Sequence, residues 1–417
     1  MLKRPPEERT GRQTSKRYKS NTKEQKKPYH LLVEEVTVQE VAVSRDRLYV
    51  SIVCSTKQSG SYNTVVYRIN GEPISVVARI PHSHAASWSP KGTLAVIEGG
   101  PLSFGGRVGI YHHKDDFKQT RTLPMEVEYK AQSIAWSPEC SFGRDILSVG
   151  YDDSTVRIFD VCDTSACNML LTRTFSHYAS FMKWSPSGEG LAIGLTEGGV
   201  YLMVFTRKCP AYAMREYDSR VRYICWSIDG DFASVDDENR MRMFDGNNVT
   251  EHARPKLDGV MKDSPLFGSR GGHIIAVSAC EKKVLGIVVM AGEDEDAEGE
   301  QGCFAVATLD DDRVFTSIDM SRCGEWMVTG DSRGNVQVWA TGGTHLPGKP
   351  IYTQKVMEGK VTHVKWTWST RTYGQANLIV SVNDKVYILK AVIRSNAEQG
   401  CLDCAVKRER ERRGEGK

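Results

Sequence analysis

Cysteine pairs are the first residues in this chain whose types and spacing could do chemistry. Cys401 and Cys404 form one Cys-x-x-Cys motif, the spacing at which two thiolates hold zinc. Zinc needs four ligands, and Cys162 with Cys167 would supply the other two only if folding brought the pairs together. A redox motif would need a thioredoxin-like helix start, and the surrounding sequence has no such pattern. We therefore predict neither a metal nor a redox site at these cysteines.

Two pairs of histidines are close enough in sequence to suggest a metal site. His82 and His84 form one pair, and His112 and His113 form the other. The acidic residues placed with them are 115–116, and no thiolate lies near. Structural or exposed histidines are therefore the favoured interpretation, and we predict no metal.

Motifs that bind phosphate or activate a nucleophile are not recognisable. The glycine-rich run at 99–106 lacks the Gly-Lys-Ser/Thr that cradles a phosphate, so it is interpreted as a loop between two strands. No Gly-x-Ser-x-Gly elbow occurs. We predict no catalytic residue, no cofactor and no small-molecule substrate.

Tryptophans recur at a fixed phase and indicate the elements that organise the chain. A short apolar strand ends in Trp-Ser at spacings of 42 to 48 residues, at Trp88, Trp136, Trp184 and Trp226. The same phase continues upstream and downstream, at Val43, Met320 and Trp366. Units of this length with about four short strands predict propeller blades that bury their faces by stacking. We expect the tryptophans to pack between blades; the alternative is a ring of aromatics that cages a ligand.

The repeat resembles the WD-repeat family. "DILSVGYDDSTVRIFD" (145–160) and "WMVTGDSRGNVQVWA" (326–340) are similar to that family's second and third strands. The resemblance covers roughly residues 30–393 and implies an all-β propeller of seven or eight four-stranded blades. Eight units can be counted in the sequence. The family's turn aspartate is matched at Asp153, but other units carry Glu197, Glu238 or Arg333 there. We therefore expect only a partial network of turn hydrogen bonds.

Domain boundaries follow from composition and from ring closure. We predict a disordered basic tail at 1–28, a propeller at 29–393 and a charged tail at 394–417. Residues 29–35 (YHLLVEE) are expected to supply the outer strand of the last blade and so tie the two ends together. No run of about 18 apolar residues occurs, and no secretory signal is recognisable, so no membrane contact is predicted.

The tails concentrate positive charge. Residues 1–27 hold ten Lys or Arg against three Glu, and residues 407–417 hold six against three, so the remainder is net acidic although the chain is +3 overall. The N-terminal tail resembles a bipartite nuclear import signal, with basic residues at Lys3, Arg4, Lys16, Arg17 and Lys19. The alternatives are a solubilising tail or a nucleic-acid contact made through phosphates. Eleven scattered cysteines fit free thiols in a reducing compartment. We expect a nuclear location, with the cytoplasm as the alternative.

The resulting functional prediction is a non-catalytic scaffold for protein subunits of a multi-subunit nuclear complex. Out-of-phase aromatics in predicted rim loops are the interface candidates: Phe104, Phe117, Trp368 and Tyr373. Residues 86–160 are similar to two blades of the propeller in a subunit of transcription factor IIIC, which implies a role in RNA polymerase III transcription but assigns no functional residue. The alternatives are direct nucleic-acid or chromatin binding within the transcription machinery, and an enzyme whose active site lies on the channel face.

Overall fold

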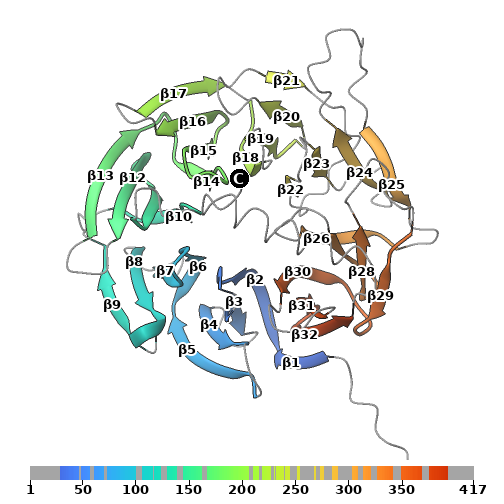
Figure 1. Cartoon of the computed structure of the whole chain (residues 1–417). Coiled ribbons are helices and arrows are strands. Elements are labelled where there is room, and N and C mark those ends of the chain that lie inside the picture. Colours follow the sequence, from blue (N-terminus) through green and yellow to red (C-terminus); the bar gives the residue numbers. More distant parts are fainter. Residues whose placement is uncertain are drawn as a thin grey trace, which may run out of the picture.

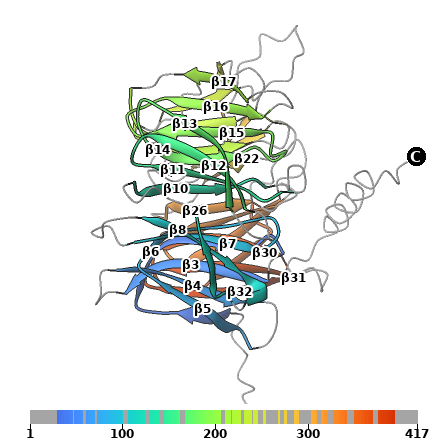
Figure 2. The same ribbon diagram turned by 90° about the vertical axis from the view of Figure 1, so that its left-hand side faces the viewer.

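Eight four-stranded antiparallel sheets surround a common axis in the computed structural model of this chain (Figure 1). The structure describes residues 29–392 with gaps, of which the longest are 254–266, 277–283, 290–302 and 341–348. The two predicted tails lie outside the described residues. Seen edge-on, the strands run roughly along the ring axis (Figure 2). The described sheets bring the blade number to eight, where the repeat had left seven and eight open.

The first four blades each contain four consecutive strands, numbered from the axis outward. Blade 1 has β2 (Val36–Val43), β3 (Tyr49–Thr56), β4 (Tyr62–Arg68) and β5 (Ser75–Pro81). Blade 2 has β6 (Ser83–Trp88), β7 (Thr93–Glu98), β8 (Arg107–His112) and β9 (Gln119–Thr122), with a 3-10 helix at His113–Asp115. Blade 3 has β10 (Ala131–Trp136), β11 (Ile146–Tyr151), β12 (Thr155–Val161) and β13 (Cys167–Thr174). Blade 4 has β14 (Ala179–Trp184), β15 (Gly190–Leu195), β16 (Val200–Phe205) and β17 (Pro210–Arg215).

The second half of the ring repeats this order until the last blade. Blade 5 has β18 (Val221–Trp226), β19 (Phe232–Asp236), β20 (Met241–Phe244) and β21 (Glu251–Ala253). Blade 6 has β22 (Phe267–Gly268), β23 (His273–Ala276), β24 (Val284–Val289) and β25 (Cys303–Thr308). Blade 7 has β26 (Phe315–Met320), β27 (Trp326–Asp331), β28 (Asn335–Ala340) and β29 (Tyr352–Lys355). Blade 8 has β30 (Val361–Trp368), β31 (Gln375–Val382), β32 (Lys385–Val392) and β1 (Tyr29–Val33).

Ring closure joins the N-terminal strand to the last strand of the described chain. β1 pairs antiparallel with β32, and Leu31 lies opposite Tyr387. Leu32 and Val33 pack against a buried cluster that includes Ile388 and residues of blade 1. The prediction that residues 29–35 supply the outer strand of the last blade is therefore confirmed, and closure removes the open edge that a linear array would leave.

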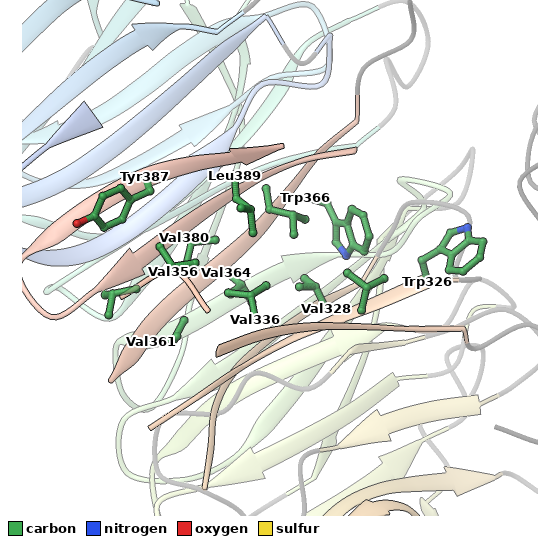
Figure 3. Close-up of a cluster of buried hydrophobic side chains, with 13 residues drawn as sticks. Trp326, Val328, Val336, Val356, Val361, Val364, Trp366, Val380, Tyr387 and Leu389 are labelled. Atoms are coloured by element: carbon green, nitrogen blue, oxygen red, sulfur yellow. The ribbon is translucent and has the colours of Figure 1, made fainter. Parts of the chain in front are cut away.

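Burial across each blade explains the apolar patterning. The second strands β7, β11, β15 and β27 are buried at all six positions, because neighbouring blades cover both of their faces. Between blades 7 and 8, Trp326, Val336, Val364 and Trp366 belong to one such apolar layer (Figure 3). The outer strand β13, by contrast, has no fully buried residue.

The in-phase tryptophans of blades 3, 4, 5 and 8 each link their blade to the one before it. The indole N–H of Trp136 donates to the carbonyl of Ser87, 3.0 Å away in the preceding blade. Trp226 donates to the carbonyl of Lys183 at 3.0 Å. The same bond runs from Trp184 to Ala135 O (3.2 Å) and from Trp366 to Asp319 O (3.3 Å). The tryptophans therefore pack between blades, as predicted.

Small residues let adjacent blades approach closely. A Cβ on Gly330 would lie 2.3 Å from a Val361 methyl carbon, and one on Gly194 would lie 2.5 Å from a methyl carbon of Val221. Both valines begin the inner strand of the next blade. The glycines are thus required by the spacing between blades, since a side chain there would push the sheets apart.

Turn aspartates form a more complete network than the sequence predicted. Asp153 accepts from the backbone N–H of Thr155 at 2.9 Å and pairs with Arg157. In blades 5 and 7 the equivalent acceptors are Asp236 and Asp331, which end the second strand instead of occupying the turn. They accept from the backbone N–H groups of Arg240 and Asn335. The expectation of a partial network was therefore wrong for these two blades. Their aspartates carry out the same capping from two positions earlier.

We predict that Trp136→Ala lowers the free energy of unfolding by roughly 3–5 kcal/mol, because it removes a buried indole and its bond to the neighbouring blade. Urea unfolding followed by intrinsic fluorescence measures the change. Trp136→Phe retains an aromatic ring and should cost less. A loss below about 1 kcal/mol for the alanine variant would contradict a packing role.

Candidate functional site

Phe117, predicted as an exposed rim aromatic, lies in the core. It is 5% exposed and packs edge-on against Tyr49, with ring centroids 5.0 Å apart, and against Trp88 at 5.7 Å. A left-handed backbone (φ 56°) follows the 3-10 helix and turns the chain at this point. The interface assignment of Phe117 is therefore wrong, because its ring fills the space between blades 1 and 2.

The other predicted contact residues divide into two groups. Trp368 is the last residue of β30 and pairs with Ala376, so it lies in a strand and not in a loop. Phe104 and Tyr373 lie outside the described residues, as do the basic residues of the import-like motif: Lys3, Arg4, Lys16, Arg17 and Lys19. Their proposed roles stay predictions.

The histidines and cysteines serve the hairpins and the core. The Nδ1 atom of His84 lies 3.1 Å from Gly99 O, and that of His112 lies 3.1 Å from the Thr93 hydroxyl. Cys54 and Cys225 are buried and free, and burial raises the pKa of Cys225 to about 12, so its thiolate is disfavoured. Among the described residues, no three His, Cys, Asp or Glu side chains are grouped to hold a metal. Cys162, Cys401 and Cys404 fall outside them.

Charged side chains from different blades converge at the ring axis. The innermost strands β2, β14, β26 and β30 surround this axis (Figure 1). They carry Glu40, Lys183, Asp319 and Lys365 respectively. Lys183 interacts electrostatically with Lys365 and Asp319, although blade 4 and blades 7 and 8 are far apart in sequence. We call these four residues the axial cluster.

Within the axial cluster, Asp319 has both carboxylate oxygens engaged. Its Oδ1 lies 3.3 Å from the Lys365 ammonium, and its Oδ2 accepts the backbone N–H of Trp366 at 2.8 Å. The Asp319 side chain is largely buried, whereas Lys365 is about one-third exposed. This arrangement fixes the Asp319–Lys365 pair between blades 7 and 8.

Lys183 is solvent-exposed, but its ammonium is crowded by the surrounding strands. This desolvation lowers the pKa of Lys183; Lys365 lowers it further, while Cys225 and Asp319 oppose the shift. Within the described part of the chain, no hydrogen bond or ion pair reaches the Lys183 ammonium.

Glu40 completes the axial cluster beside blade 8. Burial raises its pKa, and the backbone N–H of Ala86 and the charge of Lys365 only partly offset this. The Ala86 N–H donates to Glu40 Oε2 at 3.3 Å, which joins blades 1 and 2. Burial thus disfavours the charged form of Glu40, while the charge of Lys365 favours it.

Turns that follow the inner strands brace one face of the ring. The Arg45 guanidinium donates to the carbonyl of Pro138, which connects blades 1 and 3. Ser89 donates to Asp145 at 3.3 Å, and the Lys91 ammonium lies 3.8 Å from the same carboxylate. Lys183 and Asp319 each stand one residue before the end of their inner strand, so they lie towards this braced face.

The sequence contained a signal for the axial cluster that went unused. Lys183, Asp319 and Lys365 each immediately precede the repeated Trp or Met position. Reading that position across the repeats would have collected these residues as one set. Glu40 stands outside this set, because it lies two residues before Ala42, the equivalent position in blade 1.

An exposed apolar pair lies on the outer edge of blade 3. β13 is the last strand of its sheet and has eight residues, more than any other outer strand that the structure describes. Met169 and Leu170 on it are 56% and 48% exposed. A long edge strand with exposed apolar side chains is the kind of surface to which another chain can add.

Comparison with known proteins relates one segment of the chain to a repeat family. Residues 119–160 match the family model "WD domain, G-beta repeat". No curated protein matches the sequence. Helices long and apolar enough to cross a membrane were not found among the described residues.

Solved structures share the architecture at low sequence identity. Sqt1 of Saccharomyces cerevisiae aligns with a TM-score of 0.63 at 10% identity, over 87% of this chain and 98% of that one. The C-terminal WD40 domain of Sif2 aligns with a TM-score of 0.56 at 11% identity, over 87% and 98%. A chain from a crystal structure of the Mitotic Checkpoint Complex aligns with a TM-score of 0.50 at 16% identity, over 75% and 88%. At these identities the likeness shows the fold alone.

We predict that Glu40→Gln raises stability at pH 7. The folded-state pKa of Glu40 exceeds its unfolded value of about 4.3, so its stabilising contribution is complete below that pH. It is lost as the pH rises through the folded-state pKa. Thermal unfolding from pH 4 to pH 8 should show a flatter profile for this variant. Glu358→Gln, an exposed carboxylate, is the control. A lower midpoint for Glu40→Gln at pH 7 would contradict the burial argument.

Proposed function

Because this chain is a WD40-type β-propeller, we propose that it is a non-catalytic scaffold that holds protein subunits in a complex. The free edge of β13, with Met169 and Leu170 exposed, carries this proposal. An extended segment of a protein partner would add to this edge through backbone hydrogen bonds and cover the two apolar side chains. The remaining surface is presented on a closed ring, which keeps such a contact fixed in space.

Structural neighbours support a role in protein assemblies. One of them is a chain in a crystal structure of the Mitotic Checkpoint Complex, and another is the WD40 domain of Sif2. Because the sequences are distant, these neighbours support the class of function and no particular partner.

A catalytic role at the axis is less well supported than the scaffold. Asp319, the carboxylate that interacts with Lys183, already accepts from Lys365 and Trp366. It is therefore not available as a proton acceptor beside the lysine, as a general base would need to be.

The finer proposal is a nuclear complex that acts in transcription. It is supported by the basic residues of 1–28 and by the resemblance of residues 86–160 to a subunit of transcription factor IIIC. Direct binding of nucleic acid through the basic tail is the alternative, since neutralising phosphates with Lys and Arg needs no folded site.

The scaffold proposal predicts that stoichiometric protein subunits co-purify with the full chain from native extract after nuclease treatment. Replacing Met169 and Leu170 with Lys should remove at least one subunit, because charge would then occupy the apolar edge. Thr174→Lys, an exposed position on the same strand, is the matched control. Mass spectrometry identifies and quantifies the subunits. Association that nuclease abolishes would favour the nucleic-acid alternative instead.

The nuclear proposal is tested separately in the tail. A variant with five basic residues replaced by Gln should not accumulate in the nucleus, while its set of co-purifying subunits should stay unchanged. The replaced residues are Lys3, Arg4, Lys16, Arg17 and Lys19. Fluorescence microscopy of the tagged full chain measures location. An unchanged location rules out the import function, whereas loss of a steeply salt-dependent affinity for DNA or RNA would identify the tail as a nucleic-acid contact.

A further inference from the structure

We propose that the partner segment held at the β13 edge combines apolar and acidic side chains, with two apolar residues over Met169 and Leu170 and a carboxylate on Arg173. The inference rests on the proposed scaffold function and specifies which chemistry this edge selects in a partner. It is carried by the strand register of blade 3 and by the charge of the outer strands.

Backbone groups on the outer side of β13 define where a segment can add. β13 is the last strand of its sheet, beyond β12. The N–H of Phe175, the residue that follows β13, donates to the carbonyl of Ser154 at 2.9 Å. Because inward and outward groups alternate along an antiparallel strand, Thr172 and Thr174 turn their N–H and C=O groups away from β12. A segment placed beside residues 171–174 would therefore be held through its own backbone.

A bulge sets the spacing between the apolar pair and the charge. Met169 pairs with Phe159 and Arg173 pairs with Val156, whereas Leu170 has no counterpart in β12. Met169 and Arg173 are thus three ladder positions apart, or about 10 Å along the strand. An odd number of positions places their side chains on opposite faces of the sheet. In an added strand, the acidic residue must therefore lie three positions from the residue that covers Met169.

Packing of β12 identifies the two faces. Phe159 belongs to the apolar cluster shared with blade 2, and Val156 belongs to the cluster shared with blade 4. Met169 therefore faces blade 2, where the Thr172 hydroxyl lies 3.1 Å from its sulfur atom, and Arg173 faces blade 4. Both Met169 and Arg173 are exposed. The edge thus offers an apolar contact on one face and a cationic contact on the other.

The outer strands around this edge are basic. In blades 2, 3 and 4 the outer strands β9, β13 and β17 each contain one Arg and neither Asp nor Glu, although the chain between the two tails is net acidic. At the neighbouring turn of blade 3, the Asp153 carboxylate pairs with Arg157 at 3.0 Å. A partner carboxylate fits the planar fork of a guanidinium with both of its oxygens. The apolar pair favours a polypeptide over a nucleic acid, because Met169 and Leu170 offer phosphate no favourable contact.

Peptide display against the full chain tests the predicted pattern. Short random peptides are selected on the unsubstituted chain and depleted on a variant with Met169→Thr and Leu170→Thr. This variant keeps the net charge and the basic tail but loses the apolar contact. We expect the remaining peptides to be enriched in two adjacent apolar residues with Asp or Glu two positions beyond them, in either chain direction. Equal frequencies of Glu, Gln and Lys at that position overturn the proposal.

A charge swap measures the contribution of Arg173. By fluorescence polarisation, Arg173→Gln should weaken binding of a selected Glu-containing peptide roughly threefold to fivefold, as expected for a surface ion pair. It should not change binding of the same peptide with Gln in place of Glu. Arg173→Glu should prefer the peptide that carries Lys there. Unchanged unfolding midpoints would show that these variants fold.

Arg79→Gln is the matched control, because Arg79 is an exposed arginine on β5, the outer strand of blade 1. It should leave all the affinities unchanged. If Arg79→Gln and Arg173→Gln weaken binding alike, the attraction is general and the proposal fails. It also fails if a single-stranded oligonucleotide displaces the peptide from the unsubstituted chain and loses affinity with Arg173→Gln, since the edge then binds nucleic acid.

Failure of this proposal is distinguishable from failure of the scaffold function. Peptides that depend on Met169 and Leu170 but show no acidic preference contradict the role of Arg173 and leave the β13 edge as a docking site. If no peptide depends on the apolar pair, the proposal fails, and co-purification from extract then decides on the scaffold. Stoichiometric subunits retained there would mean a scaffold that uses another surface, whereas their absence would mean that the scaffold function is wrong.

Discussion

The bond from an indole N–H to a carbonyl of the preceding blade is the interaction on which the ring depends. It recurs from Trp136, Trp184, Trp226 and Trp366, each reaching the residue just before the equivalent position of its neighbour. Two of those acceptors are the carbonyls of Lys183 and Asp319. The repeat that stacks the blades therefore also holds the backbone of Lys183 and Asp319 in the axial cluster. Packing and candidate function are joined through the same peptide groups.

Rigidity follows from how little room this stacking leaves. Gly194 and Gly330 sit where any side chain would meet the first residue of the next inner strand. Closure by β1 on β32 then links the first and last blades of the described ring. Where neighbouring blades are bonded in this way, displacing one blade strains the next, so contact surfaces there keep their geometry before a partner arrives. Preorganisation of this kind favours binding, because less conformational freedom is lost.

The sequence predicted the ring better than it predicted which residues lie on the surface of the ring. Trp-Ser phase and strand alternation are local signals, and they led to the fold, to eight units and to the closing strand at 29–35. Phe117 was misplaced, because whether a rim aromatic turns inward is decided by a left-handed residue and by two rings from other strands. Asp236 and Asp331 were overlooked, because their capping starts two residues before the family position. Such details depend on tertiary contacts that periodicity does not encode.

Which charged side chains meet at the axis is likewise decided by tertiary contacts. Asp319 and Lys365 meet directly between the adjacent blades 7 and 8, whereas Lys183 lies on the inner strand of blade 4 and shares the axis with them only in the assembled ring. Stacking of blades 7 and 8 accounts for the Asp319–Lys365 pair and leaves Lys183 apart from it. A closed ring, however, forces inner-strand residues of all blades around one axis, so a charge placed there interacts across the whole repeat.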